Sequence, residues 1–121
     1  MVFEMKIRSN YEPAAAFRET ARTLVKGGDC IFSVPTFSTR ETTQRRARIH
    51  SDGGEEILVG EARYHGNPID AKGAVATFHN GYDLPDLFYQ WSGMQVEIIR
   101  FHDWYHGIVG PQIEIYVCLK R

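Results

Sequence analysis

Two nearly identical strand-like segments near the C-terminus constrain the fold of this chain more than any other feature. Residues 95–98 read Gln-Val-Glu-Ile and residues 112–115 read Gln-Ile-Glu-Ile, so apolar and polar side chains alternate in both. Alternation with a period of two is typical of a β-strand with one buried face. The sequence therefore predicts two paired strands that hold out the connector between them, residues 102–111.

The apolar pattern differs between the two segments. The later one has an uninterrupted apolar face, formed by Ile113, Ile115, Val117 and Leu119. In the earlier one the apolar positions change phase between Ile98 and Ile99. This change predicts either a β-bulge at that point or a strand whose two faces are both buried beneath helices.

Two amphipathic helices are expected before these strands. The first spans residues 13–26, starts with a proline that suits a first helical turn and ends at two consecutive glycines. Its expected buried face comprises Ala14, Phe17, Ala21, Leu24 and Val25. The second helix is shorter, is capped by Asp83 and ends near Gly93. Its expected buried face comprises Leu84, Leu87, Phe88 and Trp91.

Further strand-like segments occupy much of the remaining chain. They are residues 3–8, 30–38, 43–51, 55–64 and 73–79. Pro35 cannot donate a backbone hydrogen bond, so its segment suits an edge strand or a bulge. Residues 43–51 and 55–64 are expected to form a hairpin around the turn 52–54, with Gly54 in the left-handed conformation. The expected register pairs Ile49 with Ile57, Ala47 with Val59 and Arg45 with Glu61.

These segments together predict one α+β domain over residues 1–121. Its sheet is expected to be mostly antiparallel, with five to seven strands, one long N-terminal helix packed across it and one short helix. A length of 121 residues is common for a domain with a single core. The apolar fraction of 43% and the charged fraction of 24% are ordinary for a globular protein and disfavour a disordered or coiled-coil chain.

Charge and cysteine content restrict the expected partners and compartment. The formal net charge of -1 disfavours a general coat of nucleic acid, so polyanion binding would need a local basic patch. The start of the chain does not resemble a signal peptide and its apolar runs are strand-sized, so we expect a cytoplasmic protein without membrane contact. Cys30 and Cys118 lack zinc-ligand spacing. Two free thiols are expected, with one disulfide as the alternative if their strands are neighbours.

The connector contains the first candidate site. Its residues His102, Asp103, Trp104, Tyr105 and His106 combine aromatic surface with hydrogen-bonding groups. Aromatic side chains give large contact areas with few rotors, so a partner or ligand contact is expected here. The alternative is that Trp104 folds inward and covers the core. The histidine spacing also matches a helical zinc site, but a connector between strands does not supply that helix, so no metal is expected.

A basic strand is the second candidate site. Residues 40–48 contain four arginines and one acidic residue. The candidate contacts are Arg45, Arg46, Arg48 and His50. Arginine presents a planar set of donors that suits phosphate and carboxylate groups, so the expected ligand is an anionic nucleotide. The alternative is a solvated strand whose arginines are offset by glutamates across the hairpin.

No motif in the chain names a reaction, and no catalytic residue or cofactor is expected. The sequence favours a small non-enzymatic intracellular binding protein, such as a phage or bacterial inhibitor, immunity protein or sequestering protein. It would act by occupying a protein or an anionic nucleotide. The alternative is a phosphodiesterase-like enzyme that uses histidine and arginine residues on a nucleotide or nucleic acid. An exposed strand edge and the aromatic residues also suggest a homodimer.

Overall fold

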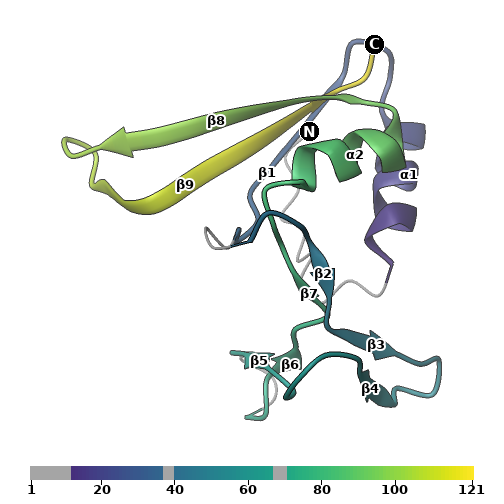
Figure 1. Ribbon diagram of the computed structural model, residues 1–121. Helices are drawn as coiled ribbons and strands as arrows, with labels where there is room; N and C mark the ends of the chain where they lie inside the picture. Colours follow the sequence, from purple (N-terminus) through teal and green to yellow (C-terminus); the bar gives the residue numbers. More distant parts are fainter. Residues whose placement is uncertain (1–11, 37–39, 67–70) are drawn as a thin grey trace.

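Two helices, several short strands and two long C-terminal strands make up the part of the chain that the structure describes (Figure 1). The computed structural model describes residues 12–36, 40–66 and 71–121, and the strand expected at residues 3–8 lies outside these ranges. In chain order the elements are α1 (Pro13–Thr23), β1 (Asp29–Phe32), β2 (Gln44–Arg45), β3 (Ala47–Ile49), β4 (Glu55–Ile57), β5 (Tyr64–His65), β6 (Ala74–Val75), β7 (Phe78–His79), α2 (Leu84–Ser92), β8 (Gln95–Asp103) and β9 (Ile108–Leu119). All strand pairs among them are antiparallel, which confirms the α+β class. Neither of these helices has the length and apolarity needed to cross a membrane.

The prediction of one sheet with five to seven strands is wrong. Within the described ranges, β1, β9 and β8 form a three-stranded sheet in that order, whereas β2 pairs with β7, β3 with β4 and β5 with β6. One point at which the expected sheet is divided lies at Arg46. Its N–H and that of Ala47 both donate to the carbonyl of Thr77, at 2.7 and 3.2 Å. Two donors on one acceptor interrupt the ladder, so residues 44–49 change partner from β7 to β4.

Several strands are also shorter than expected. β1 ends at Phe32, before Pro35, and lies at the edge of its sheet as the proline predicts. The segment 55–64 is strand-like only up to Ile57 and again at Tyr64. Residues 73–79 form two strands, β6 and β7, instead of one. Interrupted pairing of this kind replaces one broad sheet by several small ones.

The register of the β3–β4 hairpin differs from the expected one by two residues. Ala47 lies opposite Ile57, so the connecting loop comprises residues 50–54 instead of 52–54. Gly53, and not Gly54, has a positive φ, of 84°. The Asp52 carboxylate accepts a hydrogen bond from the Gly54 N–H at 2.8 Å and stabilises this longer loop. Because the shift is even, each side chain of the strand keeps its expected face.

Aromatic side chains join the two helices to the three-stranded sheet. Phe17 of α1 is fully buried, and its ring stacks on that of Phe88 of α2 with 4.4 Å between centroids. The rings of Phe32 and Tyr116, from β1 and β9, lie 5.2 and 5.3 Å from that of Phe88. The buried cluster consists of Phe17, Leu24, Cys30, Phe32, Val34, Leu84, Phe88, Met94, Tyr116 and Cys118. Both helices therefore contribute to one core.

The second helix lies where the sequence predicts it, but Asp83 does not cap it. The Asp83 side chain makes no hydrogen bond to the helix N-terminus. Its Oδ1 instead accepts hydrogen bonds from the N–H and the hydroxyl of Thr43, at 2.7 and 2.6 Å, and so ties α2 to the residue before β2. Gly93 ends the helix as expected, with a φ of 70° and an N–H that donates to the Tyr89 carbonyl.

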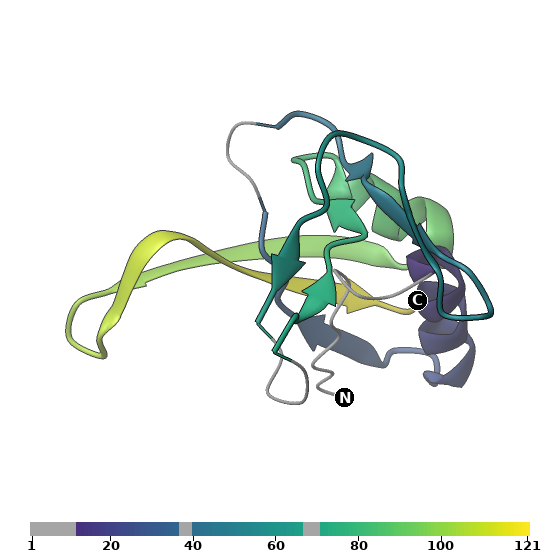
Figure 2. The same ribbon diagram turned by 90° about the horizontal axis from the view of Figure 1, so that it is seen from below.

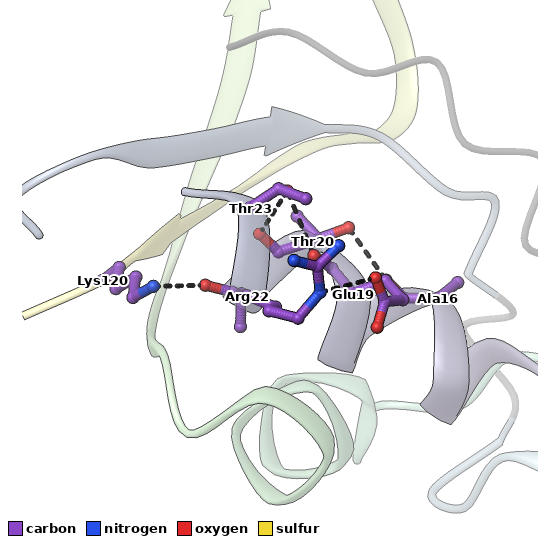
Figure 3. A network of polar contacts seen from close by, with 7 residues as sticks. Ala16, Glu19, Thr20, Arg22, Thr23 and Lys120 are labelled. Atoms are coloured by element: carbon purple, nitrogen blue, oxygen red, sulfur yellow. Dashed lines mark hydrogen bonds and ion pairs between the residues drawn. The ribbon is translucent and has the colours of Figure 1, made fainter. Parts of the chain in front are cut away.

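The first helix ends at Thr23 instead of at residue 26. Leu24 already has an extended backbone, and Val25, which was expected on the buried face, is 75% exposed. Lys120 reaches the last turn of α1 from the end of β9 (Figure 3). Its ammonium group donates to the carbonyls of Ala21 and Leu24 at 2.6 Å each. These carbonyls have no partner within a helix that stops here, so a distant lysine replaces the missing helical N–H groups.

We expect Lys120→Met to lower the free energy of unfolding by about 1.5–3 kcal/mol, since hydrogen bonds from a charged donor contribute roughly that much. Methionine retains most of the aliphatic chain and loses the donor. Urea unfolding measures the change. Lys26→Met, at an exposed lysine just after α1, is the matched control and should change the value by less than about 0.5 kcal/mol. Equal losses in the two variants would show that the contact with α1 contributes nothing.

The face of β9 that carries isoleucine and valine side chains is not its buried face. Glu114, Tyr116 and Cys118 are buried, whereas the described side chains that alternate with them are half-buried. Cys118 lies directly opposite Cys30 of β1, and both are free thiols as expected. Burial raises the pKa of both thiols, that of Cys118 to about 12, so both are protonated at neutral pH.

Candidate functional site

A two-stranded arm projects from the three-stranded sheet (Figures 1 and 2). β8 and β9 are paired from end to end, which confirms the pairing that the twin segments predict. β1, however, pairs only with residues 116–119 of β9. Residues 99–115, here called the arm, therefore form a ribbon to which no third described strand is added. A two-stranded ribbon is at best marginally stable on its own in water, so further contacts at its surface would stabilise it.

A tight turn at the end of the arm exposes two large aromatic side chains. Trp104 is 76% exposed and Tyr105 is 93% exposed, so Trp104 does not fold inward to cover the core. Asp103 closes the turn, because its Oδ1 accepts the N–H groups of Tyr105 and His106 at 2.9 and 3.2 Å. Its Oδ2 lies 2.7 Å from His106 Nδ1. Gly107, with a φ of 69°, completes the reversal of the chain.

The two histidines of the tip lie edge-on to its aromatic residues. The His102 ring is 5.5 Å from that of Trp104, and the Tyr105 ring is 5.0 Å from that of His106, measured between centroids. The structure thus brings together all five tip residues that the sequence singled out. Across the described ranges, no three histidine, cysteine or acidic side chains are grouped as metal ligands would be.

The contact between Asp103 and His106 makes the tip sensitive to acid. The hydrogen bond with His106 is the largest reason why the pKa of Asp103 lies below its ordinary value, and backbone N–H groups lower it further. A carboxylate with a lowered pKa stabilises the folded turn above its ordinary pKa. That contribution is lost as the pH falls through the lowered pKa. We expect the amide resonances of Tyr105 and His106 to shift with a midpoint below about 3.9, the ordinary value for aspartate.

The control for this titration is Asp103→Asn. The amide retains an oxygen that accepts from the backbone, but it has no acidic proton. The acid transition of the two tip amides should therefore be absent. A wild-type midpoint at or above the ordinary aspartate value would show that Asp103 does not hold the turn through its charge.

Apolar side chains along the ribbon extend the exposed surface beyond the tip. The exposed ones are Ile98, Ile99, Phe101 and Val109. Sequence reasoning did not include these residues in the candidate site, although the phase change of the apolar pattern at residues 98 and 99 could have indicated them. The pairing is regular there and shifts only between Phe101 and Asp103, so the expected bulge is wrong in its position. Apolar residues at consecutive positions instead belong to residues 97–102 of β8, whose side chains are exposed on both faces of the strand.

A buried carboxylate fixes the base of the arm. The Glu114 side chain is only 4% exposed and accepts hydrogen bonds from Arg100 Nε at 2.8 Å and from the Tyr116 hydroxyl at 3.1 Å. The Tyr116 hydroxyl also lies 3.1 Å from Thr36 Oγ1. Burial raises the pKa of Tyr116 to about 12, so the hydroxyl is neutral. The network links both strands of the arm to the segment that follows β1.

The candidates of the basic strand do not share one binding surface. Arg45 forms an ion pair with Glu12 at 2.8 Å. Arg48 and His50 both contact Glu56 across the hairpin, at 3.6 and 3.2 Å. The contacts with Glu56 correspond to the alternative of arginines offset by glutamates across the hairpin, whereas Glu12 lies outside the hairpin. Arg46 is held differently, by backbone carbonyls.

The basic strand and the tip of the arm lie well apart in the molecule. In both views the turn between β8 and β9 lies at the outer end of the arm, whereas β2 and β7 lie in the body from which the arm projects (Figures 1 and 2). A single nucleotide therefore cannot place its phosphate on this strand and its base on Trp104 or Tyr105. The two candidate sites have to be considered separately.

Comparisons with known proteins add no family or function. No protein-family model matches the chain, and neither a curated protein nor a solved structure shows significant similarity to it. Functional inference consequently depends on the geometry of the described residues.

Proposed function

We propose that this is a small non-enzymatic binding protein that occupies a protein partner with the tip of its arm. The observation that carries the proposal is the exposure of Trp104 and Tyr105 at the end of a projecting ribbon. Large exposed apolar patches commonly mark interaction sites, and tryptophan and tyrosine are enriched at interface hot spots. A phage or bacterial inhibitor, immunity protein or sequestering protein would act in this way.

The chemistry of the arm favours a protein over a nucleotide. Arg100 is the one lysine or arginine within residues 98–115, and its guanidinium group is already paired with Glu114 at 2.8 Å. Binding of phosphate groups depends on cationic donors. The exposed isoleucine, phenylalanine and valine side chains beside the tip instead suit the apolar centre of a protein interface.

The tip is also organised before a partner arrives. The Asp103 carboxylate holds two amides of the turn, and the histidine rings lie against the exposed aromatic rings. Glu114 holds the base of the arm from its buried position. Groups that are already ordered lose less conformational entropy on association, which strengthens binding.

Shortening the arm tests the proposal. A variant in which Asn-Gly replaces residues 100–114 joins Ile99 to Ile115 through a two-residue turn and leaves the buried cluster in place. Native affinity capture from the source cells should recover a stoichiometric protein with the wild-type chain and not with the short-arm variant. Circular dichroism confirms that the variant is folded. Recovery of the same protein by both chains would contradict the proposal.

A second copy of the chain is the competing occupant of this surface, in keeping with the homodimer expected from the sequence. Light scattering of the purified protein separates the two cases. We expect a monomer that converts to a larger species only when the partner is added. A dimer that dissociates on Trp104→Ala would assign the tip to self-association and would overturn the proposal.

A further inference from the structure

We propose that an open cavity beside Arg46 binds a small molecule that carries a phosphate group. The cavity has a volume of about 600 Å³ and is lined by Arg46, Gly60, Glu61, Ala62, Arg63 and Tyr64. This volume is typical of small-molecule sites. The site is distinct from the aromatic tip and does not depend on the binding function proposed for the arm.

Arg46 is anchored in a way that leaves part of its guanidinium group available. Its Nη2 donates to the carbonyl of Val59 at 2.9 Å and to that of Glu61 at 3.0 Å. These bonds account for both hydrogens of Nη2. Within the part of the chain that the structure describes, its Nε and Nη1 donate to no other residue. Both atoms are accessible to solvent, because neither is among the buried atoms that have no partner. A guanidinium group that is already fixed can offer these donors to an oxyanion with little loss of rotamer freedom.

Gly60 allows the loop to approach this guanidinium group closely. Its φ is 62°, which lies in the left-handed region that favours glycine. A Cβ at this position would lie 3.3 Å from Arg46 Nη2, closer than ordinary van der Waals contact. Any side chain here would therefore strain the backbone and press on the anchored arginine. The glycine keeps both the loop and the donor group in place.

Positive charge exceeds negative charge among the residues that line the cavity. Arg46 and Arg63 supply two cations, and Glu61 supplies one carboxylate. The Arg63 backbone is fixed, because its carbonyl accepts the Ala76 N–H at 2.7 Å, while its side chain is exposed. A phosphate monoester, with up to two negative charges and several acceptor oxygens, matches two arginines better than a neutral ligand does.

Tyr64 supplies an aromatic surface at the rim. Its hydroxyl donates to Glu55 Oε2 at 2.9 Å, and the Lys72 ammonium group lies 4.8 Å from the centre of its ring. These contacts hold a ring that is 38% exposed. An exposed aromatic ring next to a phosphate site can stack with the base of a nucleoside monophosphate. The ligand class is therefore a phosphate monoester, with a nucleotide as one source of it.

The proposal is tested by NMR titration of the whole protein with sodium phosphate and with adenosine monophosphate, at constant ionic strength. The amide of Gly60 and the Nε–H of Arg46 should shift and saturate with both probes. Tighter binding of adenosine monophosphate would assign a contact to its nucleoside, and equal affinities would assign the site to the phosphate group alone. Both results support the proposal. Shifts that sodium chloride reproduces at equal ionic strength would overturn it, because they would reflect screening of charge.

Arg63→Gln provides the discriminating variant. It leaves both anchoring bonds of Arg46 in place and should weaken phosphate binding about tenfold. Arg18→Gln, at an exposed arginine of α1, is the matched control and should leave the affinity unchanged. Equal affinities of the Arg63→Gln variant and the wild-type protein would overturn the proposal.

Discussion

Replacing Trp104 by alanine is expected to weaken the complex with the protein partner by roughly 30- to 1000-fold, which corresponds to about 2–4 kcal/mol. A loss of this size is typical of a tryptophan at the centre of an interface. Trp104 is 76% exposed in the free protein, so its removal opens no cavity in the core. Titration calorimetry with the captured partner measures the dissociation constant. Unchanged thermal unfolding of the variant shows that the loss arises at the interface.

Tyr89 is the matched control for this substitution. It is an aromatic residue on α2 that is 60% exposed, and it lies outside the arm. Tyr89→Ala should change the dissociation constant by less than about twofold, as expected for a residue outside the hot spot. If Tyr89→Ala weakened the complex as much as Trp104→Ala, the interface would not be specific to the tip.

Phe17→Ala is expected to lower the free energy of unfolding by about 3–5 kcal/mol, the usual range for a buried phenylalanine. The Phe17 ring stacks on that of Phe88, and it lies edge-on to that of Phe32 with 5.3 Å between the Phe17 and Phe32 centroids. Truncation would leave a cavity between α1, α2 and β1. A domain of this size has a total stability of about 5–15 kcal/mol, so the variant should unfold at much lower urea concentration.

Val25→Ala is the control in the same part of the chain. Val25 is 75% exposed beyond the end of α1, so its truncation should change the stability by less than about 0.5 kcal/mol. The comparison also tests where the helix ends, since a helix that continued to residue 26 would bury Val25. Similar losses in the Phe17 and Val25 variants would contradict the packing described above.

Local patterns in the sequence predicted those parts of the fold that depend on neighbouring residues. The spacing of Leu84, Phe88 and Trp91 placed one face of α2 against the core, and Gly93 ended that helix in the left-handed conformation. Period-two alternation predicted the pairing of β8 with β9. These features follow from side-chain direction and backbone preference within a few residues, which a single sequence displays.

Features that depend on distant residues were not predictable in the same way. The end of α1 is bound by Lys120, which is far from it in sequence. Glu114 faces the core because Arg100 and Tyr116 provide its hydrogen bonds, whereas the pattern of β9 favoured burial of the alternate positions. The double use of the Thr77 carbonyl divides a strand that looked continuous. Each of these contacts outweighs a local preference and leaves no local signal.

The same distinction applies to the candidate sites. Residue types alone identified the cluster from His102 to His106, but only the short pairing of β1 shows that the ribbon projects and exposes Trp104. The arginines were recognised as one basic segment. Their partners, among them Glu12 and the Val59 carbonyl, come from other parts of the chain and direct each guanidinium group to a different place.

Amide hydrogen exchange of the partner complex tests the role of the arm most directly. Free and bound protein are compared residue by residue, so the interface is located without any substitution. Binding through the tip predicts that exchange slows mainly within residues 99–115 and stays unchanged in strands β2 and β7. Slower exchange confined to residues 44–65, with the arm unaffected, would contradict the proposed function.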